Sequence, residues 1–403
     1  MANYTRQMPS DVLIHNELKC YSGYTLFAPS FQNRMAWLID MRGNVVHFWE
    51  MEHPPGLNCK LLPNGNLMWL GRGPHIMQGL NASADELIEV DWDGKEVWRY
   101  DDPYLHHDFH VLDNGHILIL RHVKLPVQIQ KKLRGGVPGT ELNGHTYGVQ
   151  IREINRAGQS RWEWNNWEHF DPEQHVECPF CDREVWGYTN SIDTFANGDP
   201  VLSVRRMNSV MRICKKTGAI TWVWGPEQLL GHQHDVSVTE QGTLTIFDNG
   251  LHRRIHTPGV DHNDTSCFHA SRLLEVDPDT GTILWEYIDP MHLIISNFCG
   301  SVQKLPNGNY LACDSAAGTF YEITPEKEVV WKYVSPFLLR IPEKFGWSIT
   351  RLMFQAHRYG PDFEGLAGRD LSPENYEWVI QKRGKEDDHQ EELVRRRLEM
   401  AGY

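Results

Sequence analysis

The amino-acid sequence predicts an all-β fold: a six-bladed β-propeller with a short C-terminal helical extension. Two observations lead to this prediction. A hairpin motif with a tight, glycine-containing turn recurs along the chain, and a second hairpin motif that ends in tryptophan follows each copy. Units of about 45–65 residues with four short strands are typical of propeller blades. An open β-solenoid is the alternative interpretation of the same repeat.

The first motif predicts the two inner strands of each blade. Apolar and polar residues alternate on both sides of the turn, which indicates paired strands, and Asn-Gly supplies the positive φ angles that tight turns need. The five copies are "CKLLPNGNLMWLG" (59–71), "FHVLDNGHILIL" (109–120), "SIDTFANGDPVLSV" (191–204), "VSVTEQGTLTIFD" (236–248) and "VQKLPNGNYLACD" (302–314).

The second motif predicts the two outer strands. It occupies residues 86–100, 149–164, 209–224, 271–287 and 319–333, and a further copy lies at 35–50. Its repeated tryptophans are expected on equivalent outer strands, between neighbouring blades: Trp49, Trp98, Trp162, Trp222, Trp285 and Trp331. The unit at 22–50 has no inner hairpin of its own, so we expect it to take its missing strand from the segment after residue 334. That pairing would close the ring.

Three parts follow from this repeat: an N-terminal segment (1–21), the propeller (22–358) and a C-terminal extension (359–403). The charged stretch from Ser372 predicts a helix, with Pro373 in its first turn. Its few apolar residues favour a solvent-facing helix or an oligomer contact over a membrane element.

Composition narrows the partners. The chain has 403 residues and a net charge of −14, with no basic block outside its C-terminal end, so nucleic acid and anionic membranes are not expected partners. A small aromatic or anionic molecule is the expected substrate, and a homo-oligomer stays open. The first residues have no apolar signal-peptide core and the eight cysteines are scattered, so we expect reduced thiols and a cytoplasmic location.

Polar residues recur where the inner strands begin. In a propeller these strands lie nearest the axis, so their first residues are expected to meet at one mouth of a central channel. The residues are Asn58, His107-Asp108, Asn190-Ser191, His234-Asp235 and Asn297. A neutral imidazole can act as nucleophile, base or metal ligand, and a nearby Asp can fix its tautomer. The plainer interpretation is that both His-Asp pairs only satisfy turn backbone.

Two arginines extend this candidate site. Arg205 and Arg206 are expected on the second strand of the Asn190 blade, where adjacent residues face opposite sides. One of them would therefore bind an anionic substrate group and the other would be a surface cation.

Three stretches resemble the bacterial arylsulfate sulfotransferase family: "HHDFHVLDNG" (106–115), "TNSIDTFANGDPVLSVRR" (189–206) and "QHDVSVTEQGTLTIFDNG" (233–250). The resemblance runs through about residues 35–333, and "FQAHRYGPDFEGLAGRDL" (354–371) is similar to the C-terminal segment of the family's cytoplasmic relatives. It implies a six-bladed propeller that transfers sulfuryl groups between phenols through a sulfated histidine, with no cofactor.

The resemblance also implies roles for single residues. His234 would be the nucleophile, His107 the neighbouring acid/base, and Asn190 and Arg205 the anion-binding groups. The family tends to have His-x-Asn-Ser where this chain has Tyr188-Thr-Asn-Ser191, so Tyr188 would replace a histidine as hydroxyl donor. Further substrate-binding candidates are Arg206, Asn58 and Asn297.

Two other functions fit the sequence. In a divalent-metal-dependent lyase or hydrolase, the metal ligands would be His107, His234 and a loop histidine, either His145 or His269. These loop histidines belong to long connections at 121–148, 165–189 and 251–270, where binding specificity is often built. A propeller used only as a binding module is the third hypothesis.

One tight cysteine pair is separate from the predicted channel. Cys178 and Cys181, with His169 and His175 just upstream, could form half of a zinc site that stiffens their loop. Because no second CxxC occurs in the chain, loop cysteines packed as small hydrophobic groups are the alternative. We expect the two sulfurs to lie close enough to share a ligand or a disulfide.

Overall fold

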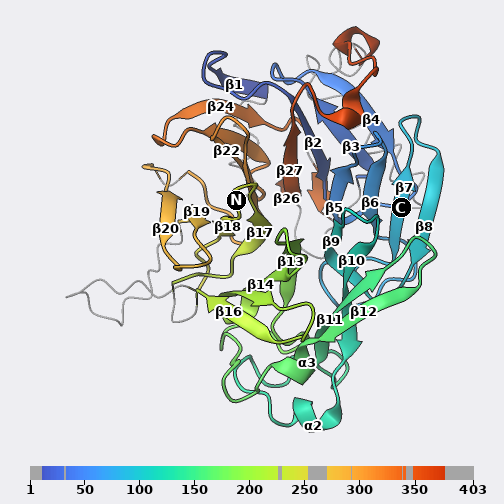
Figure 1. The fold of residues 1–403 in the computed structure, drawn as a ribbon, viewed down its shortest axis with the longest axis vertical. Helices are drawn as coiled ribbons and strands as arrows, with labels where there is room; N and C mark the ends of the chain where they lie inside the picture. Colours follow the sequence, from blue (N-terminus) through green and yellow to red (C-terminus); the bar gives the residue numbers. More distant parts are fainter. Residues whose placement is uncertain are drawn as a thin grey trace.

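Six antiparallel sheets stand around a common centre. The computed structural model of the protein describes residues 11–30, 33–225, 229–252, 270–291, 293–337, 339–341 and 348–376. In Figure 1 the first strands of the blades lie near the centre and the fourth strands at the periphery. This arrangement confirms the six-bladed β-propeller over the solenoid.

Blades 2 to 5 are each built from one continuous stretch of chain. Each runs from its innermost to its outermost strand in sequence order. Blade 2 contains β5 (Pro55–Leu61), β6 (Leu67–Gly71), β7 (Glu86–Val90) and β8 (Glu96–Asp101). Blade 3 contains β9 (Leu105–Val111), β10 (Ile117–Lys124), β11 (Tyr147–Ile154) and β12 (Ser160–Asn165). Blade 4 contains β13 (Thr189–Thr194), β14 (Pro200–Val204), β15 (Ser209–Ile213) and β16 (Ile220–Trp224). Blade 5 contains β17 (His234–Val238), β18 (Leu244–Asp248), β19 (Arg272–Val276) and β20 (Ile283–Tyr287).

Blade 1 closes the ring. Its three outer strands come from the start of the chain: β2 (Tyr24–Pro29), β3 (Met35–Ile39) and β4 (Val45–Glu50). Its innermost strand, β27 (Met353–Tyr359), pairs with β2, with Tyr24 opposite Tyr359. The segment after residue 334 therefore supplies the missing strand, as the sequence predicts. A short two-stranded sheet, β25 (Leu339–Ile341) and β26 (Ser348–Thr350), precedes β27.

Blade 6 has a fifth strand. Its own strands are β21 (Ser301–Lys304), β22 (Tyr310–Asp314), β23 (Thr319–Ile323) and β24 (Val329–Val334). The sequence alone places residues 1–21 outside the propeller, whereas β1 (Asp11–His15) pairs with the outer edge of β24. Val12 packs against the core cluster of blades 1 and 6, so β1 both pairs an exposed sheet edge and buries apolar surface.

The predicted tryptophans lie on the outermost strands in equivalent register. In every blade from 2 to 6 the tryptophan stands opposite the residue just before a bulge: Glu89–Trp98, Glu153–Trp162, Arg212–Trp222, Glu275–Trp285 and Glu322–Trp331. In blade 1 that position is His47, opposite Leu38, and Trp49 lies two residues further along.

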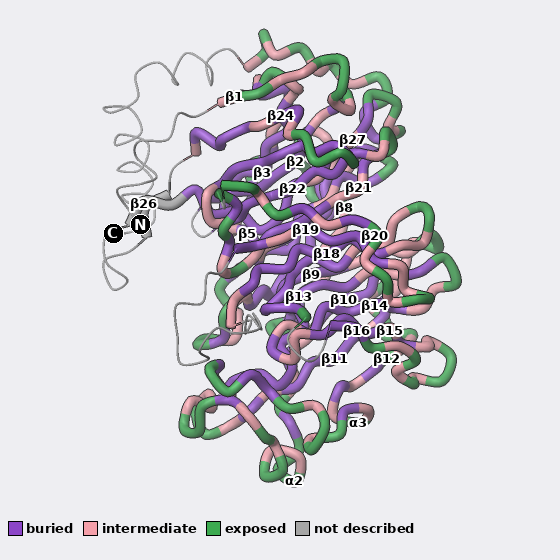
Figure 2. Tube along the Cα trace, turned by 90° about the vertical axis from the view of Figure 1, so that its left-hand side faces the viewer, coloured by how far each residue is buried: buried purple, intermediate pink, exposed green. Residues whose placement is uncertain are grey.

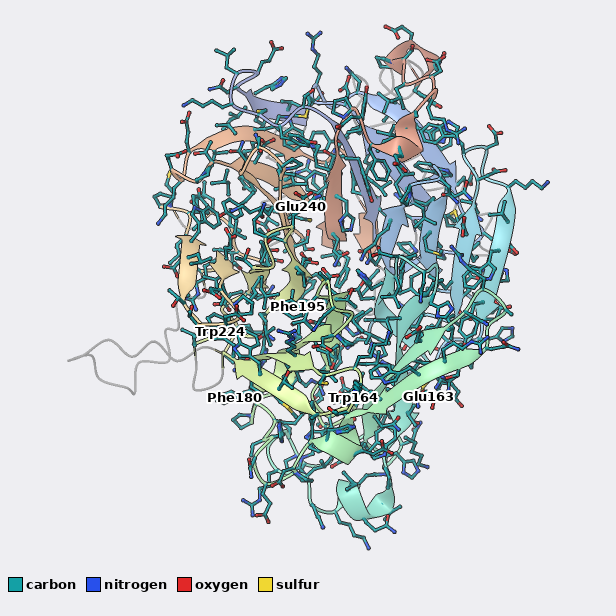
Figure 3. The ribbon with its side chains drawn as sticks, viewed as in Figure 1. Glu163, Trp164, Phe180, Phe195, Trp224 and Glu240 are labelled. Atoms are coloured by element: carbon teal, nitrogen blue, oxygen red, sulfur yellow. The ribbon has the colours of Figure 1, made fainter. Side chains whose placement is uncertain are left out.

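These indoles tie each blade to the next. The N–H of Trp331 donates to Met41 O at 2.9 Å and that of Trp98 to Arg156 O at 2.7 Å, and both acceptors lie in the outer turn of the following blade. In blade 4 the donor is Trp224, which reaches Gly281 O at 2.9 Å (Figure 3). Each of these bonds links the outermost strand of one blade to the following blade.

The hydrophobic core lies between the blades. In Figure 2 the strands are largely buried, whereas the turns and the α2–α3 region are largely exposed. One cluster joins Trp49 of blade 1 to Leu61 and Trp69 of blade 2, and comparable clusters fill other junctions. A single four-stranded sheet cannot bury its own apolar faces, so each blade depends on its neighbours for a hydrophobic core.

Polar side chains on the inner strands bond to the backbone of the next blade. Asp108 on β9 accepts from Ile192 N–H on β13 at 2.9 Å. Asp235 on β17 accepts from Val302 N–H on β21, also at 2.9 Å. The aspartate of each His-Asp pair therefore holds two blades together, and this part of the motif is structural.

A lobe of irregular chain covers one side of blades 3 and 4. It contains the short helices α2 (Val127–Gln130) and α3 (Asn166–His169), at the bottom of Figure 1. Its two connections bond to each other, with Val137 N–H donating to Cys181 O at 2.8 Å. The lobe thus brings the loop with the cysteine pair up to the start of β13.

The C-terminal extension packs back on the propeller. Leu366, in the turn η3 (Glu364–Leu366), lies in the core cluster of blades 1 and 2. The turn η4 (Pro373–Tyr376) begins where the sequence predicts a helix, and residues 377–403 of that predicted helix lie outside the described residues. Among the described residues, the helices are all too short and polar to span a membrane.

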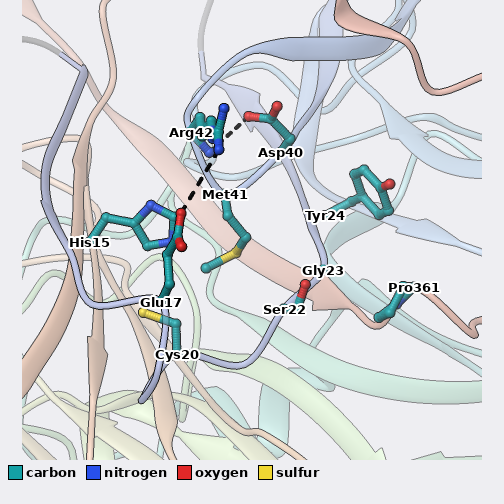
Figure 4. A pocket seen from close by; sticks show the side chains of 10 residues that line it. All are labelled: His15, Glu17, Cys20, Ser22, Gly23, Tyr24, Asp40, Met41, Arg42 and Pro361. Carbon is teal, nitrogen blue, oxygen red and sulfur yellow. Dashed lines mark hydrogen bonds and ion pairs between the residues drawn. The ribbon is translucent and has the colours of Figure 1, made fainter.

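A pocket of about 390 Å³ lies at the outer rim of blades 1 and 6, beside β1 (Figure 4). Arg42 approaches Glu17 there at 3.9 Å, and its backbone N–H donates to Asp40 at 2.9 Å. None of its lining residues is a predicted site residue.

Candidate functional site: histidines at the start of the inner strands

The backbone is irregular where the inner strands of blades 3, 4 and 5 begin. The pairing of β9, β13 and β17 with their neighbours is interrupted by bulges at these positions. His107, Tyr188 and Asp235 have φ angles of 52°, 51° and 51° there. Bulges re-aim side chains, and such φ angles in non-glycine residues persist only when the surrounding structure enforces them.

His234 is held in one tautomer by Asn249. Its Nδ1 lies 2.7 Å from the Asn249 side-chain oxygen. The Asn249 amide nitrogen donates to Ser296 O at 2.6 Å and to Cys299 O at 2.7 Å, so the carboxamide can point only one way. Its oxygen is therefore the acceptor, and His234 Nδ1 carries the hydrogen. Nε2 keeps a lone pair, which accepts a long hydrogen bond from Cys299 N–H at 3.3 Å.

His234 is also buried, with 3% of its surface exposed. Burial lowers the pKa of His234 to about 3, and the nearby positive charge of Arg205 acts in the same direction. The imidazole is therefore neutral near pH 7. Asn249, rather than the adjacent Asp235, sets its tautomer.

His107 belongs to a buried cluster of three histidines. Its Nδ1 lies 2.8 Å from Nδ1 of His106, so one of the two nitrogens donates and the other accepts. The His106 ring stacks on His122 with centroids 3.8 Å apart. Burial lowers the pKa of His107 well below its ordinary value, and the neighbouring His122 and Arg205 reinforce this.

Phe354 links the two predicted catalytic histidines. It lies on β27, the closing strand of blade 1, and is 1% exposed. Its ring centroid is 6.4 Å from that of His107 and 6.2 Å from that of His234. The imidazoles of blades 3 and 5 therefore both lie near one apolar ring from blade 1.

The two arginines lie in the turn η1 (Arg205–Met207) after β14, and not on the strand that the sequence predicts. Arg206 is buried and donates to Glu184 Oε1 at 2.7 Å and to Val185 O at 3.1 Å. Arg205 forms no side-chain hydrogen bond or ion pair with the described residues. Its charge instead lowers the pKa of His107 and His234. The alternation argument for this pair was wrong because a turn replaces the strand.

Asn190 and Tyr188 lie at the start of β13. The Asn190 amide donates to Gln233 O at 2.9 Å, and its buried Oδ1 has no partner among the described residues. Tyr188 is packed under both guanidinium groups, 4.4 Å from Arg206 and 5.7 Å from Arg205. Burial raises the pKa of Tyr188 to about 12, so its hydroxyl stays protonated.

The remaining predicted residues are less central. Asn58 is buried and donates to Asp108 Oδ1 at 2.5 Å, within the ring of inner-strand contacts. Asn297 is half-buried in the loop before β21, next to Ser296. His145 is half-buried in the α2 lobe, and His269 lies outside the described residues.

Among the described residues, His107, His234 and His145 do not converge as a metal set, and the alternative third ligand, His269, lies outside these residues. In the described part of the chain, one group of three or more His, Cys, Asp or Glu side chains converges closely enough to hold an ion: Cys178, Cys181, His232 and His252. The two histidines that the sequence places with the cysteines are used elsewhere. His169 stacks on Trp164 with centroids 4.9 Å apart, and His175 on Phe170 at 4.7 Å.

Sequence reasoning missed Asn249, Phe354 and Cys299. Asn249 carried a weak signal, because it is a polar residue directly after an apolar strand, at the same level as the start of β17. Phe354 and Cys299 carried none. Phe354 reaches the site through the closure of the ring, and Cys299 through the packing of the loop before blade 6 against blade 5.

One solved structure has a similar fold. A protein of unknown function from Bacteroides caccae is 13% identical, with a TM-score of 0.51 over 78% of this chain and 94% of that one. A virginiamycin B lyase from Staphylococcus aureus is 12% identical, with a TM-score of 0.44 over 80% of this chain and 87% of its own. No curated protein matches the sequence.

A family comparison is more specific. The arylsulfotransferase (ASST) family matches residues 59–336, which is more than half of the chain. The match spans β6 to β24 and includes His107, Asn190, Arg205 and His234. The chain belongs to the arylsulfotransferase family.

Proposed function

We propose that the protein transfers a sulfuryl group from one phenol to another, and that His234 carries the group as a sulfohistidine at the mouth of the central channel. The observation that carries this proposal is the Asn249 contact. It leaves a lone pair on His234 Nε2, on the side away from Asn249, and the substrate sulfur would displace the long hydrogen bond that this lone pair accepts from Cys299 N–H at 3.3 Å. An imidazole nitrogen with a lone pair is the form that can attack sulfur.

In the first half-reaction, His234 Nε2 attacks the sulfur of an aryl sulfate. The N–S bond forms, the S–O bond to the ring breaks, and its electron pair leaves with the phenolate oxygen. The positive charge that develops on the imidazole is stabilised by the Nδ1–H bond to Asn249. A second phenolate then attacks the sulfur, which restores the free imidazole.

Cationic and amide groups support the transferred sulfuryl group. Sulfuryl transfer, like phosphoryl transfer, spreads negative charge over equatorial oxygens, so catalysis depends on positioning and on positive charge. Arg205, which has no ion-pair partner among the described residues, supplies that charge. The Asn190 amide donates one hydrogen to Gln233 O, and its second hydrogen can bond to a sulfate oxygen.

His107 stabilises the leaving phenolate by donating a hydrogen bond to its oxygen. If His106 Nδ1 donates to His107 Nδ1, the hydrogen of His107 lies on Nε2 and can bond to the phenolate oxygen. The Phe354 ring lies near both histidines, where an aromatic ring of the substrate could pack against it. No cofactor enters either half-reaction.

The test is direct detection of the intermediate. Protein is mixed with 4-nitrophenyl sulfate, quenched, and digested for mass spectrometry. We expect one SO₃ group on the peptide that contains His234, with release of one equivalent of 4-nitrophenol. His234→Ala should lose both signals, and His145→Ala, on the α2 lobe, should keep them. A burst of 4-nitrophenol from His234→Ala equal to that of the parent protein would overturn the proposal.

A further inference from the structure

Four ligand atoms converge beside the histidine site. They are Sγ of Cys178, Sγ of Cys181 and one ring nitrogen each of His232 and His252, all within 4.8 Å of one another. Cys178 Sγ lies 3.4 Å from His252 Nδ1, and Cys181 Sγ lies 3.6 Å from His232 Nε2. In a tetrahedral zinc site, bond lengths of about 2.3 Å to sulfur and 2.0–2.1 Å to nitrogen place S and N about 3.5 Å apart. The two S–N distances in this cluster agree with that separation.

We propose that these four side chains bind Zn²⁺ in a closed, tetrahedral Cys₂His₂ site. A donor set of two thiolates and two imidazoles binds zinc in preference to harder cations such as Mg²⁺ or Ca²⁺. Because the protein supplies all four ligands, no coordination position is left for substrate, and the ion has a structural role. This site is therefore distinct from the metal centre of the lyase hypothesis.

The fold brings the ligands together without relying on the ion. Cys178 N–H donates to Arg206 O at 2.9 Å, which holds the loop of the lobe against η1. His232 N–H donates to the Asn208 side chain at 2.8 Å. Leu251 N–H, next to His252, donates to Gly231 O at 3.1 Å. Backbone contacts thus place ligands from three separate segments around one point.

Zinc at this point would join the lobe to blade 5 beside the candidate nucleophile. His232 precedes His234 by two residues, so fixing its ring fixes the backbone that leads into β17. Charge also matters, because Zn²⁺ with two thiolates and two neutral imidazoles has no net charge. Arg205 lies near enough to lower the pKa of both thiols, and in a neutral zinc site its charge would not be offset by thiolates and would act on an anionic substrate.

The first experiment measures metal in the purified full-length protein. We expect one zinc per chain by elemental analysis, and loss of that zinc in Cys178→Ser and in His252→Ala. Cys214→Ser and His145→Ala are matched controls outside the cluster and should keep it. Thiol titration of the native protein should show two cysteines that react only after a zinc chelator is added.

A second measurement does not depend on variants that fold. The wild-type protein, grown with cobalt in place of zinc, should show thiolate-to-cobalt charge transfer and the intense visible bands of tetrahedral Co²⁺. Wild-type protein without stoichiometric metal, or with a Cys178–Cys181 disulfide, would overturn the proposal. So would a cobalt spectrum with no thiolate band. None of these readouts depends on sulfuryl transfer.

Discussion

The side-chain oxygen of Asn249 accepts a hydrogen bond from Nδ1 of His234 at 2.7 Å, while the Asn249 amide is bound to two backbone carbonyls. A carboxamide whose orientation is fixed in this way fixes the tautomer of its partner. Asn249 directly follows β18, so this carboxamide lies on the same blade as His234. Replacing Asn249 should therefore change the activity of His234.

Asn249→Leu should lower kcat/KM by about 10²–10³-fold, the range found when one oriented polar group is removed from an active site. The physical reason is loss of the acceptor that stabilises positive charge on His234. Asn249→Asp keeps an acceptor oxygen for His234 Nδ1 and should retain more activity than Asn249→Leu, but it should lower the melting temperature because its second oxygen cannot donate to Ser296 O and Cys299 O. Steady-state kinetics with 4-nitrophenyl sulfate checks this order, and equal rates for both variants would contradict it. Asn114→Leu, in an exposed turn, is the control.

Arg205→Gln and Arg206→Gln should have different effects. Arg205 has no ion-pair partner among the described residues, so its replacement should reduce turnover and leave the melting temperature nearly unchanged. Arg206→Gln should reduce the free energy of unfolding by about 3–5 kcal/mol, because it leaves the buried carboxylate of Glu184 unpaired. Denaturant unfolding together with kinetics separates the two. The same profile for both variants would show that the assignment of the arginines is wrong.

The indole bonds between blades should contribute to stability. Trp331 is fully buried, and its indole N–H donates to Met41 O. Trp331→Phe removes this donor and leaves the Met41 carbonyl without it. We expect a loss of about 1–3 kcal/mol in the free energy of unfolding. Trp222, whose role in blade 4 is taken by Trp224, should tolerate substitution by Phe with less than half that loss. Chemical denaturation of both variants provides the comparison.

His47 should make stability depend on pH in the acid range. Burial lowers its folded-state pKa to about 4 from 6.5, and its ring bonds to Trp92 O and to the Tyr376 hydroxyl. The unfolded chain takes up this proton near pH 6.5. The stability that neutral His47 provides is therefore complete above pH 6.5 and is lost as the pH falls towards 4.

The expected loss from this one group is up to about 3 kcal/mol. His47→Gln keeps polar atoms in place but does not titrate, so it should flatten the slope of stability against pH between 6.5 and 4. His145→Gln, in the α2 lobe, is the control. An unchanged slope in His47→Gln would contradict the prediction. Urea unfolding at several pH values measures it.

Local sequence determined the blades. Turns such as Asn64-Gly65 and the tryptophans at one register encode hairpins that depend only on neighbours in the chain, and they were predictable for that reason. The position of His107, Asn190 and His234 at the start of β9, β13 and β17 followed from the same register. Periodicity could not show what each polar residue binds, and the aspartates after both histidines proved to hold blades together.

Tertiary structure decided the partners. Ring closure brings Phe354 to the histidines, and a lobe that folds across two blades brings Cys178 to within hydrogen-bond distance of His252, 74 residues away. Asn249 lies on the same hairpin as His234, but only the packing of the loop before β21 fixes the orientation of its carboxamide. The sequence alone paired the cysteines with His169 and His175, which are nearer in the chain but stack on aromatic rings instead. Hydrogen bonding and hydrophobic burial within a hairpin are local and leave a repeating pattern. The convergence of side chains from different blades leaves none, because it depends on how the sheets pack around the axis.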